Sequence, residues 1–459
     1  MQRAALISLV LVLVLGAGAW LALRGGSAPG PGKSEQPARV LAGLEAARVR
    51  SIEVANAAGP IAMLARLDVP DVWVLDARAD GVRVPAQESA VRGAIRVLAE
   101  LDALPAQEDH DPGEGSVDVR LTLDDGATRA VRIGGTRLGG RVACRLTGET
   151  GSKTVLAEAN VVGLFRRESM EGWAEGALVP AGAGRIAEVT VTRGDARVRL
   201  IAGRRWGMME PVVTVADADA CAALVRVLTS GGRARAGRQA SELDDLATLF
   251  VVRVRTESRA MKGDGVESVA VVHTVRGVDL GAGAVGAVVR AEDDAGRVLW
   301  GGWTADVGPG DLEPVLGPAG SYIARVASGV APADVSGVRI GGPSGAWTLS
   351  VERTVDGWRE SSGAALGGAD AAQVRALVTL LCETQAGAAT LDAVDAAAFA
   401  RGAVVVGGVE AEEFEFARGR LALESGVSEV LVVRAGAVSR VYPWGVHAGL
   451  GGWLGNRGK

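Results

Sequence analysis

The chain has 459 residues and a formal net charge of −5. This length is too great for one hydrophobic core and allows three domains of ordinary size, and the acidic balance excludes the broad basic surface of a nucleic-acid-binding protein. The three cysteines, Cys144, Cys221 and Cys382, lie far apart in the sequence. They therefore exclude a disulfide scaffold and a cysteine metal cluster.

The first segment with a clear signal is Ala4–Leu23, which contains no charged residue. A helix of this length spans about 30 Å, the hydrocarbon thickness of a bilayer. The segment predicts either an uncleaved anchor within residues 1–24 or a signal peptide cut after the small residues Ala17–Ala19. Because the apolar run continues through Trp20, we favour the anchor, with the body on the extracytoplasmic side.

Residues 25–45 are predicted to be a flexible linker. Gly25 to Arg39 is rich in glycine, proline and serine and has no apolar period. A segment of this composition acts as a spacer, so the folded body is expected to begin near residue 46.

The remaining chain repeats one pattern three times. Each copy begins with a short alternating strand, then a second apolar strand, a tryptophan (Trp73, Trp206 or Trp358), a polar break, an amphipathic helix and a block of strands. We therefore predict an α+β fold in which an N-terminal transmembrane helix is followed by three tandem β-β-α-(antiparallel sheet) units. The predicted boundaries are 1–24 for the anchor, 25–45 for the linker, and 46–178, 179–328 and 329–459 for the three units.

One nucleotide-binding motif, G-x-G-x-x-G, matches the sequence at Gly281–Gly286. A chain with 65 glycines is expected to contain such a match by chance. The following segment, Ala287–Ala291, predicts a strand where a nucleotide site needs a helix. We therefore predict no nucleotide and no other cofactor.

The three histidines, His110, His273 and His447, show no metal-ligand spacing. His110 lies in an acidic loop, where a weak cation site is conceivable, but the oxygen-ligand order of a calcium loop is absent. We favour a solvated loop and predict no metal site. The acidic residues of that loop are Glu108, Asp109, Asp111 and Glu114.

The sequence shows no arrangement typical of an active site. It has no G-x-S-x-G elbow, and a serine triad would have to use one of the same three histidines. Glu412, Glu413 and Glu415 alternate with Phe414 and Phe416, which predicts the wet face of a strand rather than a pair of catalytic acids. We therefore predict no catalytic residue and expect that the chain is not an enzyme.

Four tryptophans have no counterpart in the repeat: Trp300, Trp303, Trp444 and Trp453. The last two lie in a glycine-rich tail. The tail either presents a patch for a partner or packs on the third unit, and we favour packing.

The stretches Val117–Gly148 and Arg185–Leu228 carry a family likeness, and the third copy repeats it more faintly. They resemble the bacterial family called domain of unknown function 4340, over most of the chain. Members of that family tend to be encoded beside ABC-type transport components of the gliding-motility kind. The resemblance implies an accessory role in the cell envelope and supplies no catalytic residues.

Together these observations predict a single-pass protein of the bacterial inner membrane with most of its chain on the periplasmic side. The expected function is that of an accessory or assembly protein of an envelope ABC-type transport system. Its expected partners are the membrane and integral-membrane transport subunits, with no nucleic acid or nucleotide. Two alternatives remain: an extracytoplasmic ligand- or polysaccharide-binding module, and an unrecognised hydrolase.

Overall fold

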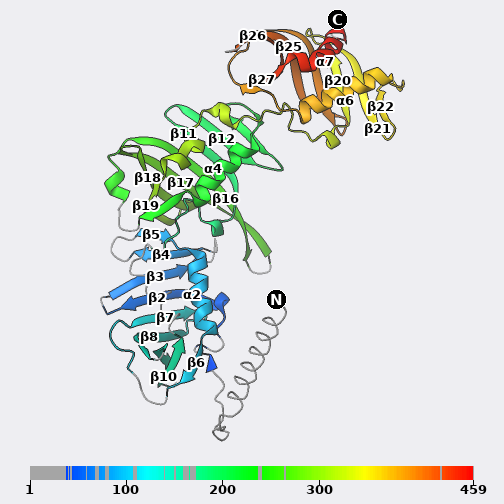
Figure 1. Ribbon diagram of the computed structural model, residues 1–459. Coiled ribbons are helices and arrows are strands. Elements are labelled where there is room, and N and C mark those ends of the chain that lie inside the picture. The colour runs from blue at the N-terminus through cyan, green and yellow to red at the C-terminus, as the bar shows by residue number, and fades with distance from the viewer. Residues whose placement is uncertain are drawn as a thin grey trace, which may run out of the picture.

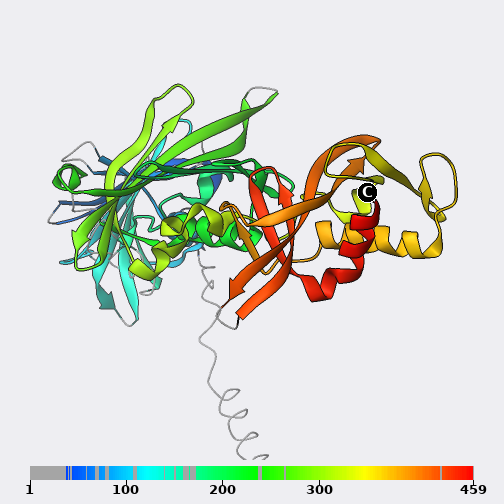
Figure 2. The ribbon, with the colours of Figure 1, turned by 90° about the horizontal axis from the view of Figure 1, so that it is seen from above.

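The structure is a computed structural model that describes residues 38–39, 41, 44–57, 59–67, 72–77, 82–106, 111–138, 140–148, 151–158, 165, 172–235, 240–262, 265–423 and 426–457. Strands dominate this part of the chain. A 19-stranded sheet holds β1–β19 and an 8-stranded sheet holds β20–β27. In Figure 1 the chain builds three successive bodies from the blue end to the red end, and the view from above in Figure 2 shows the third body set to one side of the other two.

The first part of the 19-stranded sheet is antiparallel. Its strands pair in the order β5-β4-β3-β2-β7-β8-β9-β10-β6, and β1 (Ala38–Arg39) pairs with the outer edge of β6. The elements are β2 (Val49–Asn56), β3 (Gly59–Arg66), β4 (Trp73–Ala77), β5 (Val82–Pro85), α2 (Glu88–Glu100), β6 (Asp102–Pro105), β7 (Val117–Leu123), β8 (Thr128–Leu138), β9 (Arg141–Gly148) and β10 (Gly151–Glu158).

The second part repeats this pairing as β14-β13-β12-β11-β16-β17-β18-β19-β15. Gly301 of β19 pairs with Arg83 of β5, which joins the two parts into one sheet. We call these two parts the first and second sheets, and the 8-stranded sheet the third sheet. The elements are β11 (Arg185–Arg193), β12 (Ala196–Ala202), β13 (Trp206–Glu210), β14 (Thr214–Val215), α4 (Ala218–Ser230), β15 (Gly232–Arg235), β16 (Thr248–Lys262), β17 (Gly265–Gly281), β18 (Ala284–Asp293) and β19 (Val298–Val307).

The 8-stranded sheet has the order β22-β21-β20-β24-β25-β26-β27-β23. Its elements are β20 (Gly337–Gly341), β21 (Trp347–Thr354), β22 (Gly357–Glu360), α6 (Gly368–Cys382), β23 (Ala388–Thr390), β24 (Ala396–Val406), β25 (Val409–Leu423), β26 (Gly426–Ala435), β27 (Val438–Pro443) and α7 (Trp444–Arg457). The short helices are η1 (Ala46–Arg48), η4 (Ala181–Ala183), η5 (Ala240–Leu243), η6 (Pro309–Leu312), α5 (Glu313–Leu316), η7 (Ala319–Tyr322) and η8 (Pro332–Asp334).

The predicted α+β class is wrong, because the described chain is mostly β with large antiparallel sheets. The tandem β-β-α units are wrong for a local reason. Trp73, Trp206 and Trp358 lie in strands, so at least three strands precede each main helix. The strands after each helix then pair with the first strand of the same copy, as β7 does with β2, and no separate sheet forms. The predicted domain boundaries stay a prediction.

The predicted transmembrane helix is also corrected. Among the residues that the structure describes, no helix is long and apolar enough to cross a membrane. On this finding the predicted single-pass anchor and inner-membrane location are not supported, and the segment Ala4–Leu23 itself lies outside the described residues.

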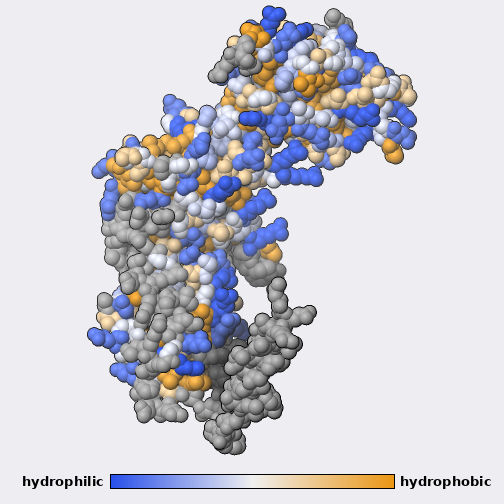
Figure 3. Space-filling view, in the orientation of Figure 1, coloured by the Kyte–Doolittle hydropathy of each residue, from blue (hydrophilic) through white to orange (hydrophobic). Residues whose placement is uncertain are grey.

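Each main helix buries one apolar stripe, as its sequence period predicted. In α2 the buried residues include Val91, Ile95 and Leu98, and the outward residues Arg92 and Arg96 are exposed. Figure 3 shows the hydrophilic strip that this outward side forms. The apolar residues recur at spacings of three and four, so they form one stripe along the helix. This stripe packs against the apolar side of the sheet and stabilises the helix there.

The helix α4 begins at a side-chain cap. The carboxylate of Asp217 accepts hydrogen bonds from the backbone N–H groups of Asp219 (3.0 Å) and Ala220 (2.9 Å). These bonds satisfy donors that the first turn of a helix leaves without partners.

The tryptophans without a counterpart in the repeat lie in the protein core or against it. Trp300 and Trp303 are 0 % and 1 % exposed, whereas Trp206 and Trp358 are only partly buried. The C-terminal tail forms β27 and α7, and the indole N–H of Trp453 donates to Asp370 Oδ1 at 2.7 Å. The tail therefore packs on the third sheet, the alternative that the sequence favoured.

A connecting segment at residues 172–180 ties the first sheet to the second. The backbone N–H of Gln87, just before α2, donates to the carbonyl of Trp173 (2.8 Å). Farther along the segment, the N–H of Val179 donates to the carbonyl of Leu228, at the end of α4 (2.8 Å). We call such a connecting segment a strap. This first strap is hydrogen-bonded to the start of α2 and to the end of α4.

Residues 322–330 repeat this arrangement between the second and third sheets. The N–H of Asp217, just before α4, donates to the carbonyl of Tyr322 (2.7 Å), and the N–H of Ser328 donates to the carbonyl of Leu381 in α6 (2.7 Å). The two straps make equivalent hydrogen bonds, so one connection is used twice along the chain.

Arg440 of β27 reinforces the second strap. Its side chain is fully buried, its Nε donates to the carbonyl of Ala324 and its Nη2 to Thr214 Oγ1, each at 3.0 Å. Glu412 Oε1 accepts from the N–H of Gly329 in the same strap at 3.0 Å. Burial lowers the pKa of Arg440, and Tyr442 and Glu412 oppose that shift. A guanidinium from the third sheet therefore holds the second sheet and the strap together.

Candidate binding surface

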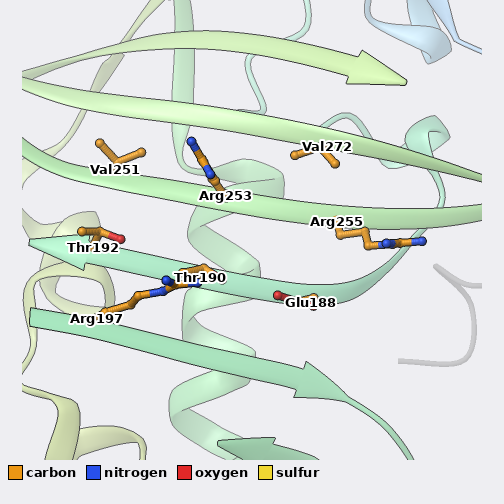
Figure 4. A pocket seen from close by; sticks show the side chains of 8 residues that line it. All are labelled: Glu188, Thr190, Thr192, Arg197, Val251, Arg253, Arg255 and Val272. Carbon is orange, nitrogen blue, oxygen red and sulfur yellow. The ribbon is translucent and has the colours of Figure 1, made fainter. Parts of the chain in front are cut away.

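A groove of about 530 Å³ lies on the outer face of the second part of the large sheet, away from α4. Figure 4 shows its side chains rising from four neighbouring strands, β12, β11, β16 and β17. The alternation of strand residues builds it: Val252 and Val254 point into the core, and Arg253 points outward. The groove is lined by Glu188, Thr190, Thr192, Arg197, Val251, Arg253, Arg255 and Val272.

Ion pairs neutralise part of the charge around this groove. Arg199 forms a bidentate pair with Glu188, at 2.7 and 3.1 Å, and these hydrogen bonds lower the pKa of Glu188. Arg197 pairs with Glu210 at 2.8 Å. Arg253 is exposed and has no ion-pair partner among the described residues, so its guanidinium is free to bind a ligand.

The first and third sheets carry grooves in corresponding places. The arginines at the centre of these two grooves form ion pairs with carboxylates of the protein. In the first sheet, Arg132 binds Asp118 through two hydrogen bonds of 2.8 and 2.9 Å, and Arg120 lies 3.7 Å from Glu53. In the third sheet, Arg339 is paired with a glutamate of β25. The second groove therefore differs from the other two in its unpaired central cation.

A more apolar groove of about 600 Å³ lies on the third sheet, between β23, β26, β27 and the start of α7. Leu421, Val430 and Val441 contribute its apolar wall, and Trp444 stands at one end. This groove belongs to the third sheet alone and does not separate two of the bodies.

Of the five residues considered for a metal site, the structure describes two. His110, Glu108 and Asp109 lie outside the described residues, and Asp111 and Glu114 are exposed. Over the described ranges, no group of three or more histidine, cysteine, aspartate or glutamate side chains could hold a metal ion.

The glycine motif Gly281–Gly286 is a hairpin turn between β17 and β18. Gly281, Ala282 and Gly283 all have positive φ angles (83°, 52° and 79°), and Gly281 pairs with Ala284. Glycine is needed here because it adopts the positive φ angles of the turn without steric cost. A strand follows the motif, as predicted from the sequence.

The three cysteines are free and buried. Burial raises the pKa of Cys144 and Cys382 to about 11 and that of Cys221 to about 12. Thiols with such pKa values hold their protons at neutral pH and are poor nucleophiles.

Glu412 departs from the wet-face expectation. Glu413 is exposed, but Glu412 turns toward the strap, where its Oε2 is buried with no hydrogen-bond partner. Alternation along β25 places Glu412 on the same face as the buried Phe414 and Glu413 on the opposite face, so the two consecutive glutamates lie in different surroundings.

His273 of β17 is fully buried. Its Nε2 lies 3.1 Å from Thr256 Oγ1, and its ring centroid lies 5.6 Å from that of Trp300. Burial lowers the pKa of His273 to about 3, so the imidazole stays neutral in the folded protein at every physiological pH.

We expect the protein to lose stability on mild acidification because of His273. Between pH 6.5 and pH 3 the unfolded chain binds a proton at this histidine and the folded chain does not, so stability falls as pH falls. The free energy of unfolding should drop by about 2 kcal/mol between pH 7 and pH 5. Urea unfolding at both pH values measures this.

The matched variants are His273→Leu and His447→Leu. The first should remove most of the pH dependence. The second removes a half-buried histidine whose pKa is also lowered by burial and should leave most of it. An unchanged pH dependence in His273→Leu would contradict the assignment.

The chain matches no protein-family model, no curated protein and no solved structure.

Proposed function

We propose that this chain is an accessory protein that works by binding other proteins through the outer face of its large sheet. The groove around Arg253 carries this proposal. It is an open trough on a sheet face, and three arginines and a glutamate are among the eight residues that line it, whereas small-molecule sites are mostly concave and have few charged groups. Arginine is among the residues enriched at protein interfaces.

The resemblance to the family called domain of unknown function 4340 supports a partner from an ABC-type transport assembly. In this proposal the chain is a contact protein of that assembly. A polysaccharide-binding module would be indicated by a pocket between two bodies, lined by tryptophan and carboxylates. The four grooves described above are each lined by residues of one body, so no specific observation favours that alternative.

Site-specific crosslinking in cells tests the proposal. A photoreactive amino acid placed at Val251 or Val272, inside the groove, should capture the same protein, identified by mass spectrometry as a transport component. The control position is Val355, which is fully exposed at the turn between β21 and β22. The proposal predicts no capture of that protein from Val355.

The variant Arg253→Glu should abolish capture from both groove positions because it reverses the charge at the centre of the groove. Capture of unrelated proteins from Val251 and Val272, or capture that survives Arg253→Glu, would contradict the proposed function.

A further inference from the structure

A row of arginines crosses the outer face of the large sheet. Seven strands lie side by side in the order β12, β11, β16, β17, β18, β19 and β5, and their Cα partners form one continuous line. Arginine occupies every second position of this line. Its members, in order, are Arg199, Thr190, Arg253, Thr274, Arg290, Gly301 and Arg83.

The four arginines, which we call the arginine row, face the same side. Directly paired residues of antiparallel strands project to one face, and the neighbours of Arg253 in its own strand are buried on the other. Adjacent strands lie about 4.8 Å apart, so successive arginines stand about 9.6 Å apart. The row also passes from the second part of the sheet to the first, at the pairing of Gly301 with Arg83.

Gly301, which lies between Arg290 and Arg83 in the line, leaves room for the side chain of Arg290. A Cβ at Gly301 would lie 3.0 Å from Cγ of Arg290, so glycine lets the arginine stem lie over the strand. Thr190 and Thr274 occupy the other intervening positions and supply short hydroxyl-bearing side chains.

The charges of the row are only half compensated within the described chain. Arg199 is held by Glu188, and Arg290 by Glu292. Arg253 and Arg83 are exposed and have no ion-pair partner among the residues described. An anionic ligand would therefore gain two unpaired guanidinium groups, and exposed pairs such as that of Arg290 exchange partners at little cost.

We propose that the arginine row binds an extended acidic segment of the partner protein, lying across the strands with a carboxylate at every third residue. The proposal rests on the protein-binding function given above. A polyproline II segment has three residues per turn and a rise of 3.1 Å, so every third side chain recurs on one side after about 9.3 Å. This repeat matches the arginine spacing of about 9.6 Å.

Other extended polymers fit the row less well. In a β-strand, side chains on one face recur about every 6.8 Å. This repeat is shorter than the arginine spacing of about 9.6 Å, so a strand that meets one arginine would not meet the next. A strand of duplex DNA carries a phosphate about every 3.4 Å, so most of its charges would face no arginine.

Fluorescence anisotropy with two synthetic peptides tests the proposal on the full chain. The first contains four repeats of Glu-Pro-Pro, and the second has the same composition with its four glutamates consecutive. We expect the spaced peptide to bind about 10-fold more tightly, because it can meet successive arginines with charge-assisted hydrogen bonds. Binding should weaken as salt is added.

The matched variants are Arg253→Gln and Arg120→Gln. Arg120 is an exposed arginine of β7 in the first sheet. Strand β7 pairs with β2 there, just as β16, which carries Arg253, pairs with β11 in the second sheet. Arg253→Gln should weaken the spaced peptide about 10-fold, which corresponds to one lost charged contact, and Arg120→Gln should leave binding unchanged. Both residues are exposed, so both variants should melt at the wild-type temperature.

Equal affinity for the two peptides, or insensitivity to Arg253→Gln, would overturn the proposal. So would tighter binding of polygalacturonate than of the spaced peptide, since an anionic polysaccharide would then be the occupant. If the peptide fails and crosslinking from Val251 still captures a transport component, the acidic segment is wrong and the protein-binding function stands. If both fail, both proposals fall.

Discussion

Replacement of Trp300 by alanine should be among the most destabilising single changes in the second part of the sheet. The indole is 0 % exposed and contacts the buried ring of His273, and removal of such a ring leaves a cavity in a close-packed interior. We expect a loss of about 3–5 kcal/mol in the free energy of unfolding, measured by urea unfolding.

Trp206→Ala is the matched control for this experiment. Trp206 lies in the same part of the sheet and is only partly buried, so its loss leaves a smaller cavity and should have a clearly smaller effect. A loss for Trp206→Ala as large as that for Trp300→Ala would show that the described packing is wrong.

Replacement of Arg440 by methionine should loosen the third sheet from the second. The variant keeps most of the apolar stem but removes the hydrogen bonds to Ala324 and Thr214 and leaves Glu412 without its nearby cation. We expect this junction to lose about 3 kcal/mol, since a buried charge without compensation is costly.

Trypsin can report this loosening directly. Arg325 is an exposed residue of the strap whose carbonyl accepts from the N–H of Ala386 (3.0 Å), so cleavage there requires the strap to open. A loss of about 3 kcal/mol would raise the cleavage rate about 100-fold if opening is faster than cleavage. Arg339→Met removes a partly exposed arginine of the third sheet and should change the rate little. Equal rates in the two variants would contradict the role of Arg440.

Local periodicity was enough to place the main helix of each repeat and most strands of this chain, but not the C-terminal helix α7. The spacing of Val91, Ile95 and Leu98 predicted the buried face of α2, and the alternation of Val117–Leu123 appears in the structure as alternately buried and outward residues. These features depend only on residues close together in the sequence, within one helical turn or one strand. They can therefore be predicted from the sequence alone. The predicted fold class was wrong, as was the polar break assigned near the tryptophans, where a further strand stands.

Tertiary structure decided the positions that matter for binding and for joining the sheets. Arg440 and Glu412 are charged residues, and they are buried or half-buried because another sheet and a strap cover them. Arg83 and Arg253 lie far apart in sequence and share one line because seven strands pair in a particular register. The sequence by itself determined which residues alternate along each strand. Only long-range pairing decided which of them meet across strands, because a one-residue slip of register moves every side chain to the opposite face.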